Sequence, residues 1–185
     1  MGRLYDQIDD RLAGYITSQP VFFVATAPLS PDGHVNCSPK GNRGELAVLD
    51  GSTVAYLEQT GSGIETVAHL RENGRVVLMF CSFSGPPRIV RLHGRGEAVV
   101  ASDPRFAELT ERLGVTPGTG ARSVVVITVD RISDSCGYGV PLMDLVDHRP
   151  QMGEWADRKG ADGVAAYRQE KNARSIDGLP GIVDA

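Results

Sequence analysis

A short stretch rich in glycine and hydroxyl side chains could bind an anion: Thr60-Gly61-Ser62-Gly63-Ile64-Glu65-Thr66. It lies between strand-forming residues and a predicted helix, so its backbone N–H groups are free to point at a phosphate near a helix N-terminus. The hydroxyls of Thr60, Ser62 and Thr66 add hydrogen-bond donors without adding charge. The alternative is an ordinary turn in which Ser62 caps the following helix, because the stretch is neither a P-loop nor a complete G-x-G-x-x-G motif.

One basic residue, Lys40, is a further candidate for contact with an anionic ligand. Lys40, in Ser38-Pro39-Lys40-Gly41, follows a predicted strand and could place a compact positive charge beside a phosphate. An exposed turn lysine is the alternative. Arg88 and Arg91 lie on another predicted strand, where the plain interpretation is a solvated strand face with cross-strand ion pairs.

The cysteines and histidines do not form a metal-binding pattern. Cys37, Cys81 and Cys136 are widely spaced without a C-x-x-C motif, and the four histidines include no H-E-x-x-H motif. We therefore expect neither a metal site nor a disulfide framework. Buried, inert thiols are the default interpretation of all three cysteines, and a reducing cytoplasm is the natural compartment for them.

Net charge and hydropathy narrow the class of partner. A formal charge of −4 and a pI near 5.5 give no electrostatic reason to expect binding to nucleic acid or to an anionic membrane surface. No run approaches the roughly 20 apolar residues of a membrane span. The first residues lack the basic start and apolar run of a secretory signal.

Apolar periodicity and turn signals predict a mainly β (α+β) fold of about six antiparallel strands with peripheral helices. Helices are predicted over residues 4–16, 65–72 and 162–172, with another beginning at residues 102–104. Asp50-Gly51 predicts a hairpin. The strands do not alternate with crossover helices, which disfavours a parallel sheet. We expect one domain over residues 1–185, with a barrel at about 20–130 and a C-terminal extension at 131–185. Within the extension, the segment 167–181 has an apolar end and is expected to dock on the barrel or on its partner.

The stretch from Val76 to Glu97, VVLMFCSFSGPPRIVRLHGRGE, resembles the central hairpin of the pyridoxamine 5'-phosphate oxidase family. The likeness consists of Leu78-Met79-Phe80, a proline-rich turn, and Arg88-x-Val90-Arg91-x-x-Gly94-Arg95-x-Glu97, and it extends over about residues 20–129. The resemblance implies a six-stranded split β-barrel with Greek-key order. It also implies a homodimer with FMN at the subunit interface, and a flavin-dependent oxidoreductase acting on an unidentified small molecule.

The same resemblance assigns the cofactor-binding residues. Lys40 resembles the lysine that ends the family's first phosphate-contacting strand, and Thr66 stands at the position of a second phosphate-binding lysine. Arg88 and Arg91 would belong to the partner's side of the site. The full expected set is Asn36, Cys37, Ser38, Pro39, Lys40, Thr60, Gly61, Ser62, Thr66, Arg88 and Arg91.

No catalytic side chain is expected, because the flavin carries the redox chemistry and backbone amides near residues 37–41 can hydrogen-bond its ring. Two alternatives stay open at this point. One is a reductase that uses the deazaflavin F420. The other is a module that binds flavin or haem without turnover.

Overall fold

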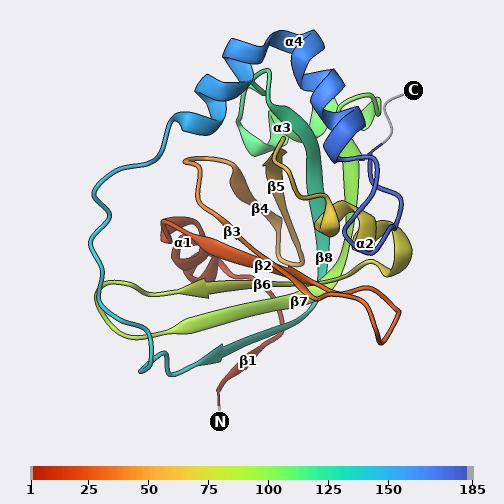
Figure 1. Ribbon diagram of the computed structural model, residues 1–185. Helices are drawn as coiled ribbons and strands as arrows, with labels where there is room; N and C mark the ends of the chain where they lie inside the picture. The colour runs from red at the N-terminus through yellow and green to blue at the C-terminus, as the bar shows by residue number, and fades with distance from the viewer. Residues whose placement is uncertain (1, 183–185) are drawn as a thin grey trace.

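The computed structural model describes residues 2–182. In it, an antiparallel β-sheet is accompanied by four helices (Figure 1). The strands are β1 (Leu4–Tyr5), β2 (Phe22–Thr26), β3 (Asn36–Lys40), β4 (Leu46–Asp50), β5 (Thr53–Gln59), β6 (Arg75–Cys81), β7 (Ile89–Val100) and β8 (Ala121–Ser135). The helices are α1 (Asp10–Ser18), α2 (Glu65–Asn73), α3 (Arg105–Leu113) and α4 (Gln151–Lys171).

The strand order across the sheet is β3-β2-β6-β7-β8-β5-β4, with β1 paired to β8. Every strand pair is antiparallel, and non-consecutive strands pair where β2 meets β6 and where β5 meets β8. The predicted antiparallel α+β class is therefore confirmed, whereas the predicted number of six strands is wrong, because the sheet has eight. Among the described residues no pairing joins the edge strands β3 and β4, so closure into a split barrel stays a prediction.

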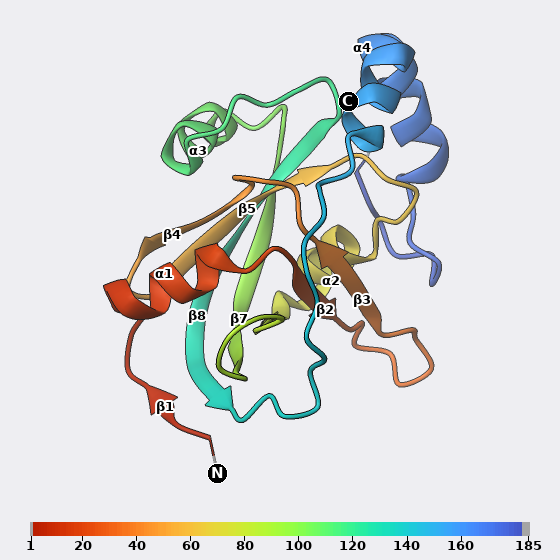
Figure 2. The same ribbon diagram turned by 90° about the vertical axis from the view of Figure 1, so that its left-hand side faces the viewer.

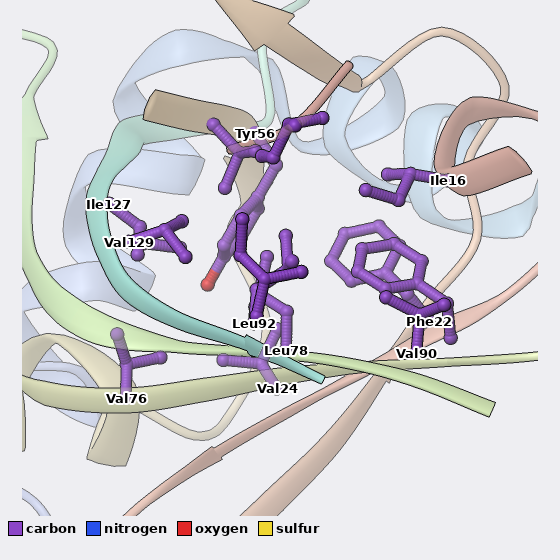
Figure 3. Close-up of a cluster of buried hydrophobic side chains, with 14 of the residues drawn as sticks. Ile16, Phe22, Val24, Tyr56, Val76, Leu78, Val90, Leu92, Ile127 and Val129 are labelled. Atoms are coloured by element: carbon purple, nitrogen blue, oxygen red, sulfur yellow. The ribbon is translucent and has the colours of Figure 1, made fainter. Parts of the chain in front are cut away.

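The main hydrophobic core lies inside the curl of the sheet (Figure 3). Val24, Leu78 and Leu92 come from three adjacent strands and are fully buried. Phe22 stacks on Phe80 and meets the ring of Tyr56 edge-on, with ring centroids 5.6 and 5.5 Å apart. The apolar alternation of β2 and β6 places these side chains on one face, which leaves the outer face and the strand ends for polar groups.

The N-terminal segment differs from its predicted single helix over residues 4–16. Helix α1 begins at Asp10, because the carboxylate of Asp9 accepts a hydrogen bond from the backbone N–H of Leu12 at 2.7 Å and caps the helix. Leu4 and Tyr5 instead pair with Ser133 and Ile132 at the end of β8. The apolar spacing of Leu4 matches a helix, but a distant strand takes its backbone hydrogen bonds.

The C-terminal helix is longer than its predicted range of residues 162–172. Helix α4 begins at Gln151 and is bent at Gly160, where φ is 68° and ψ is 171°. Residues 136–150 form an extended strap that leads from β8 along the outside of the sheet to α4 (Figure 2). Among residues 2–182, no helix has the length and apolar character needed to cross a membrane.

Candidate functional site

A hydrogen-bonded group of polar side chains links β2, β3 and α2. Asn36 Nδ2 donates to Thr66 Oγ1 at 3.0 Å and to Thr26 Oγ1 at 3.2 Å, and Ser38 Oγ donates to Asn36 Oδ1 at 3.0 Å. We call this group, together with His69, the Asn36 cluster. It brings together three residues of the predicted cofactor set, Asn36, Ser38 and Thr66, although they are up to 30 positions apart in the sequence.

His69 is the most deeply buried member of the Asn36 cluster. Sequence reasoning did not select this residue. Its side chain is fully buried, and its Nδ1 lies 2.9 Å from Thr26 Oγ1. The arrangement that satisfies both groups has the Thr26 hydroxyl donating to Nδ1, which places the ring proton on Nε2. Burial lowers the pKa of His69, so the ring is neutral. Within the described residues Nε2 has no hydrogen-bond partner, and the cluster therefore has an unused donor.

The N-terminus of α2 lies beside the Asn36 cluster. Its cap residue, Ile64, provides no side-chain hydrogen bond, and Ser62 and Gly63 are exposed. The predicted alternative, in which Ser62 caps this helix, is not observed. The first N–H groups of α2 consequently need another acceptor, and a helix N-terminus in this state attracts an anion.

Lys40 lies at the other end of β3 and contacts Glu58. Lys40 Nζ is 3.1 Å from Glu58 Oε1, and Arg122 approaches the same oxygen at 3.3 Å. Burial alone would raise the pKa of Glu58, but Arg122 and Lys40 outweigh it and lower this pKa to about 2. Glu58 is therefore an ionised carboxylate held between two cations. Sequence reasoning missed Glu58 and Arg122, although a glutamate inside the apolar run of β5 is an available signal.

One phosphate cannot contact both ends of β3. Asn36 and Lys40 are four residues apart on an extended strand, which separates their backbones by about 13 Å. A ligand that reaches both must lie along the strand. The side chains of Cys37 and Pro39, which lie between these ends, are exposed on the outer face of edge strand β3.

The C-terminal extension fastens the loop that contains Thr60 and Gly61. Thr60 Oγ1 donates to the carbonyl of Gly120 at 2.8 Å and accepts from Arg168 Nε at 2.9 Å. Asn172 Nδ2 donates to the carbonyl of Gly61 at 2.9 Å. The predicted docking of the C-terminal segment on the sheet is confirmed, and the hydroxyl of Thr60 serves this docking.

Arg88 and Arg91 lie away from the Asn36 cluster of the same chain. Arg88 donates to the Tyr5 hydroxyl at 2.7 Å and lies 3.4 Å from Asp134, while Arg91 donates to Ser135 Oγ at 3.1 Å. Arg88 also lines a cavity of about 1340 Å³ near the start of the strap. Their predicted role on the partner's side of a site stays a prediction.

The cysteines correct one sequence interpretation. Cys81 is buried as expected, but Cys37 and Cys136 are exposed. Cys37 alternates outward on edge strand β3, and Cys136 follows the last residue of β8. Among the described residues, no group of three or more His, Cys, Asp or Glu side chains is arranged to hold a metal ion.

Comparisons with known proteins identify the family and the fold of the chain. The sequence profile described as pyridoxamine 5'-phosphate oxidase matches residues 8–136. A pyridoxamine 5'-phosphate oxidase family protein of Aspergillus flavus, ustO, is 43% identical over 98% of this chain and 78% of its own length. Two crystal structures of HupZ from Group A Streptococcus share the fold, with TM-scores of 0.54, 21% and 23% identity, and coverage of 74% and 69% of this chain and 99% of theirs. The chain belongs to the pyridoxamine 5'-phosphate oxidase family.

Proposed function

We propose that the protein binds FMN along β3 and acts as a flavin-dependent oxidoreductase on a small molecule. The observation that carries the proposal is the Asn36 cluster beside the uncapped N-terminus of α2. There, the hydroxyl of Thr66 and the first backbone N–H groups of α2 are available as donors, and the Asn36 amide holds Thr66 in place. This donor set, with no carboxylate hydrogen-bonded within the cluster, suits a phosphate monoester.

The bound flavin would supply hydride transfer, and the protein would supply binding and orientation. Ser62, Thr66 and the first backbone N–H groups of α2 hold the phosphate in this proposal, and Asn36 positions Thr66. The ring then lies along residues 37–40 toward Lys40, whose ammonium group is positioned by Glu58. A ring in this place is held mainly by backbone groups, which agrees with the expectation that no side chain is catalytic.

We further propose that the protein is a homodimer and that it works in the cytoplasm. The dimer would bring Arg88 and Arg91 of a second copy toward the exposed outer face of β3. Two exposed free thiols, Cys37 and Cys136, suit a reducing compartment.

The first test is a titration of the apoprotein with FMN, followed by the quenching of flavin fluorescence. Thr66→Val removes the hydroxyl and keeps the shape of the side chain. Because a hydrogen bond to a charged group contributes roughly 1.5–3 kcal/mol, the affinity should fall about tenfold to hundredfold. Thr110→Val is the matched control, since Thr110 is also buried but its hydroxyl donates to Ala107 on α3.

Equal FMN affinities of the Thr66→Val and Thr110→Val variants would contradict this phosphate site. Parallel titrations with F420 and with haem test the other cofactors, and preferential retention of either would replace FMN in the proposal. Anaerobic bleaching of the bound flavin by NADH or NADPH, reversed by oxygen, is the expected sign of an oxidoreductase. A bound flavin that no such donor reduces would instead indicate a binding module.

A further inference from the structure

A second cavity, of about 410 Å³, lies between the 60–61 loop and α4. Its volume falls within the range of roughly 300–1,000 Å³ that is usual for small-molecule sites. Thr60 and Gly61 line one side, and Met152, Trp155, Arg158 and Tyr167 of α4 line the other. We call it the Trp155 cavity. The binding of FMN along β3 does not use the α4 side of this cavity.

The bend of α4 creates the aromatic wall. Gly160 interrupts the helix, so Trp155 from the first half and Tyr167 from the second half meet with ring centroids 4.9 Å apart and an interplanar angle of 74°. Both side chains are half-buried, and Met152 beside them is 44% exposed. A tryptophan and a tyrosine that are packed edge-to-face but still open to a cavity form a rigid wall for a planar ring.

Cationic groups flank the aromatic wall. Lys159 Nζ lies 5.5 Å from the ring centroid of Trp155 and 5.6 Å from that of Tyr167. Arg158 lines the cavity, and its partner Glu154 is 3.8 Å away in an exposed pair that water weakens. Arg168 is held against Thr60. A ligand that combines a flat ring with a negative group fits these surroundings.

The position of the cavity narrows the ligand further. Thr60 and Gly61 immediately precede Ser62 and the start of α2, where the proposed phosphate site lies. A nucleotide bound in the cavity would therefore carry its phosphate toward the same loop. Adenylate has this chemistry, since its purine can stack on the aromatic wall and its phosphate can face the basic side chains.

We propose that the Trp155 cavity binds the adenylate group of a dinucleotide. The adenylate has two possible sources, the FAD form of the cofactor or a nicotinamide dinucleotide that donates hydride, and they share this chemistry. The role of such a dinucleotide in the reaction rests on the proposed flavin-dependent function. Binding of free AMP, however, requires no flavin and tests the cavity independently.

The experiment uses the only tryptophan of the chain, Trp155, as the reporter. AMP should quench its fluorescence saturably, and ribose 5-phosphate, which has no base, should not. Tyr167→Leu and Arg158→Ala should each weaken AMP binding about tenfold, the loss expected for a base-stacking or phosphate contact. Tyr138→Leu is the matched control, because Tyr138 is 82% exposed in the strap and does not line the cavity.

Two further titrations distinguish the sources. FAD that binds more tightly than FMN, with the difference lost in Tyr167→Leu, assigns the adenylate to the cofactor. NADH or NADPH that competes with AMP, with equal affinities for FAD and FMN, assigns it to the hydride donor. Absence of saturable quenching by AMP, FAD and the nicotinamide dinucleotides overturns the proposal. The Thr66→Val titration with FMN is unaffected by that result, so failure of the cavity and failure of the flavin site are separable.

Discussion

At the scale of single residues, Glu58 shows how a charge becomes acceptable in a core. Its side chain is 1% exposed, yet it is ionised because Lys40 and Arg122 contact one of its oxygens and Ser123 Oγ donates to the other at 3.2 Å. Such a carboxylate holds Lys40 in place on the face of β3 opposite to the exposed side chains of Cys37 and Pro39. The neutral His69 adds no charge at the opposite end of β3, where burial lowers its pKa and the carboxylates of Asp177, Glu65 and Glu72 act to raise it.

Glu58→Gln should destabilise the protein by roughly 3–5 kcal/mol, because it leaves Lys40 and Arg122 without the charge that compensates them. Urea unfolding at neutral pH measures this loss. Glu97→Gln serves as the control, since Glu97 pairs with Arg105 at the surface and should cost less than about 1 kcal/mol. Similar urea midpoints for the two variants would show that the buried charges contribute nothing to the stability of the folded protein.

The same carboxylate makes stability depend on pH. The pKa of Glu58 is about 2 in the folded protein, against an ordinary value of 4.5. A lowered folded-state pKa means that the stabilisation is complete above pH 4.5 and is lost as the pH falls from about 4.5 to about 2. The wild-type protein should therefore lose stability more steeply across this interval than the Glu58→Gln variant. Parallel curves would place the acid sensitivity elsewhere.

At the scale of elements, the bend in α4 decides what the C-terminal extension can do. Gly160 has a backbone conformation that is essentially restricted to glycine. Because of the bend, Trp155 in the first half of α4 lines the cavity, while Asn172 at the end of the second half donates a hydrogen bond to the 60–61 loop. A straight helix of the same length could not bring Trp155 and Tyr167 together.

Gly160→Ala should destabilise the protein by roughly 1–3 kcal/mol, because no atom lies within 4 Å of the added methyl group and the cost is that of the backbone alone. Gly153→Ala is the matched control. Gly153 also has open space around it but ordinary helical geometry, so alanine should stabilise by roughly 0.5–1 kcal/mol. Thermal unfolding measures the melting temperatures of both variants. Equal changes in melting temperature would show that a side chain at position 160 does not strain the bend.

At the scale of the whole molecule, the strap carries several large apolar side chains that are exposed. Within residues 136–150, Tyr138, Leu142 and Val146 are 82%, 80% and 96% exposed. The strap is held by few contacts, among them Met143 N–H to the carbonyl of Phe83 at 2.9 Å and His148 Nδ1 to the carbonyl of Gly41 at 2.9 Å. Large apolar side chains exposed along one segment suit an interaction surface, and the proposed second copy of the chain would cover them.

The double variant Leu142→Asp/Val146→Asp should convert the proposed dimer into a folded monomer, because charges on a buried apolar interface oppose association. Light scattering during gel filtration measures the mass, and circular dichroism checks the fold. Ile176→Asp is the control, since Ile176 is 70% exposed but lies outside the strap. A dimer that survives the double variant would place the interface on another surface.

The sequence by itself determined the features that depend on near neighbours. Asp50-Gly51 does join β4 to β5, the predicted helix at 65–72 is α2, and the motif around Arg88 indicated the family that the comparisons confirm. Turns, helix periodicity and a family motif are local in the chain. They also sufficed to select the stretch from Thr60 to Thr66 as the approach to a helix N-terminus.

Tertiary structure alone decided which distant residues meet. The pairing of Tyr5 with Ile132 added a strand at a segment that the local pattern assigned to a helix. Thr26, Asn36 and His69 form a cluster only because β2 pairs with β3 and α2 packs against β2. The partners of Glu58 come from β3 and β8. Hydrogen bonds and ion pairs of this kind depend on how the sheet orders its strands, and neither propensity nor periodicity contains that information.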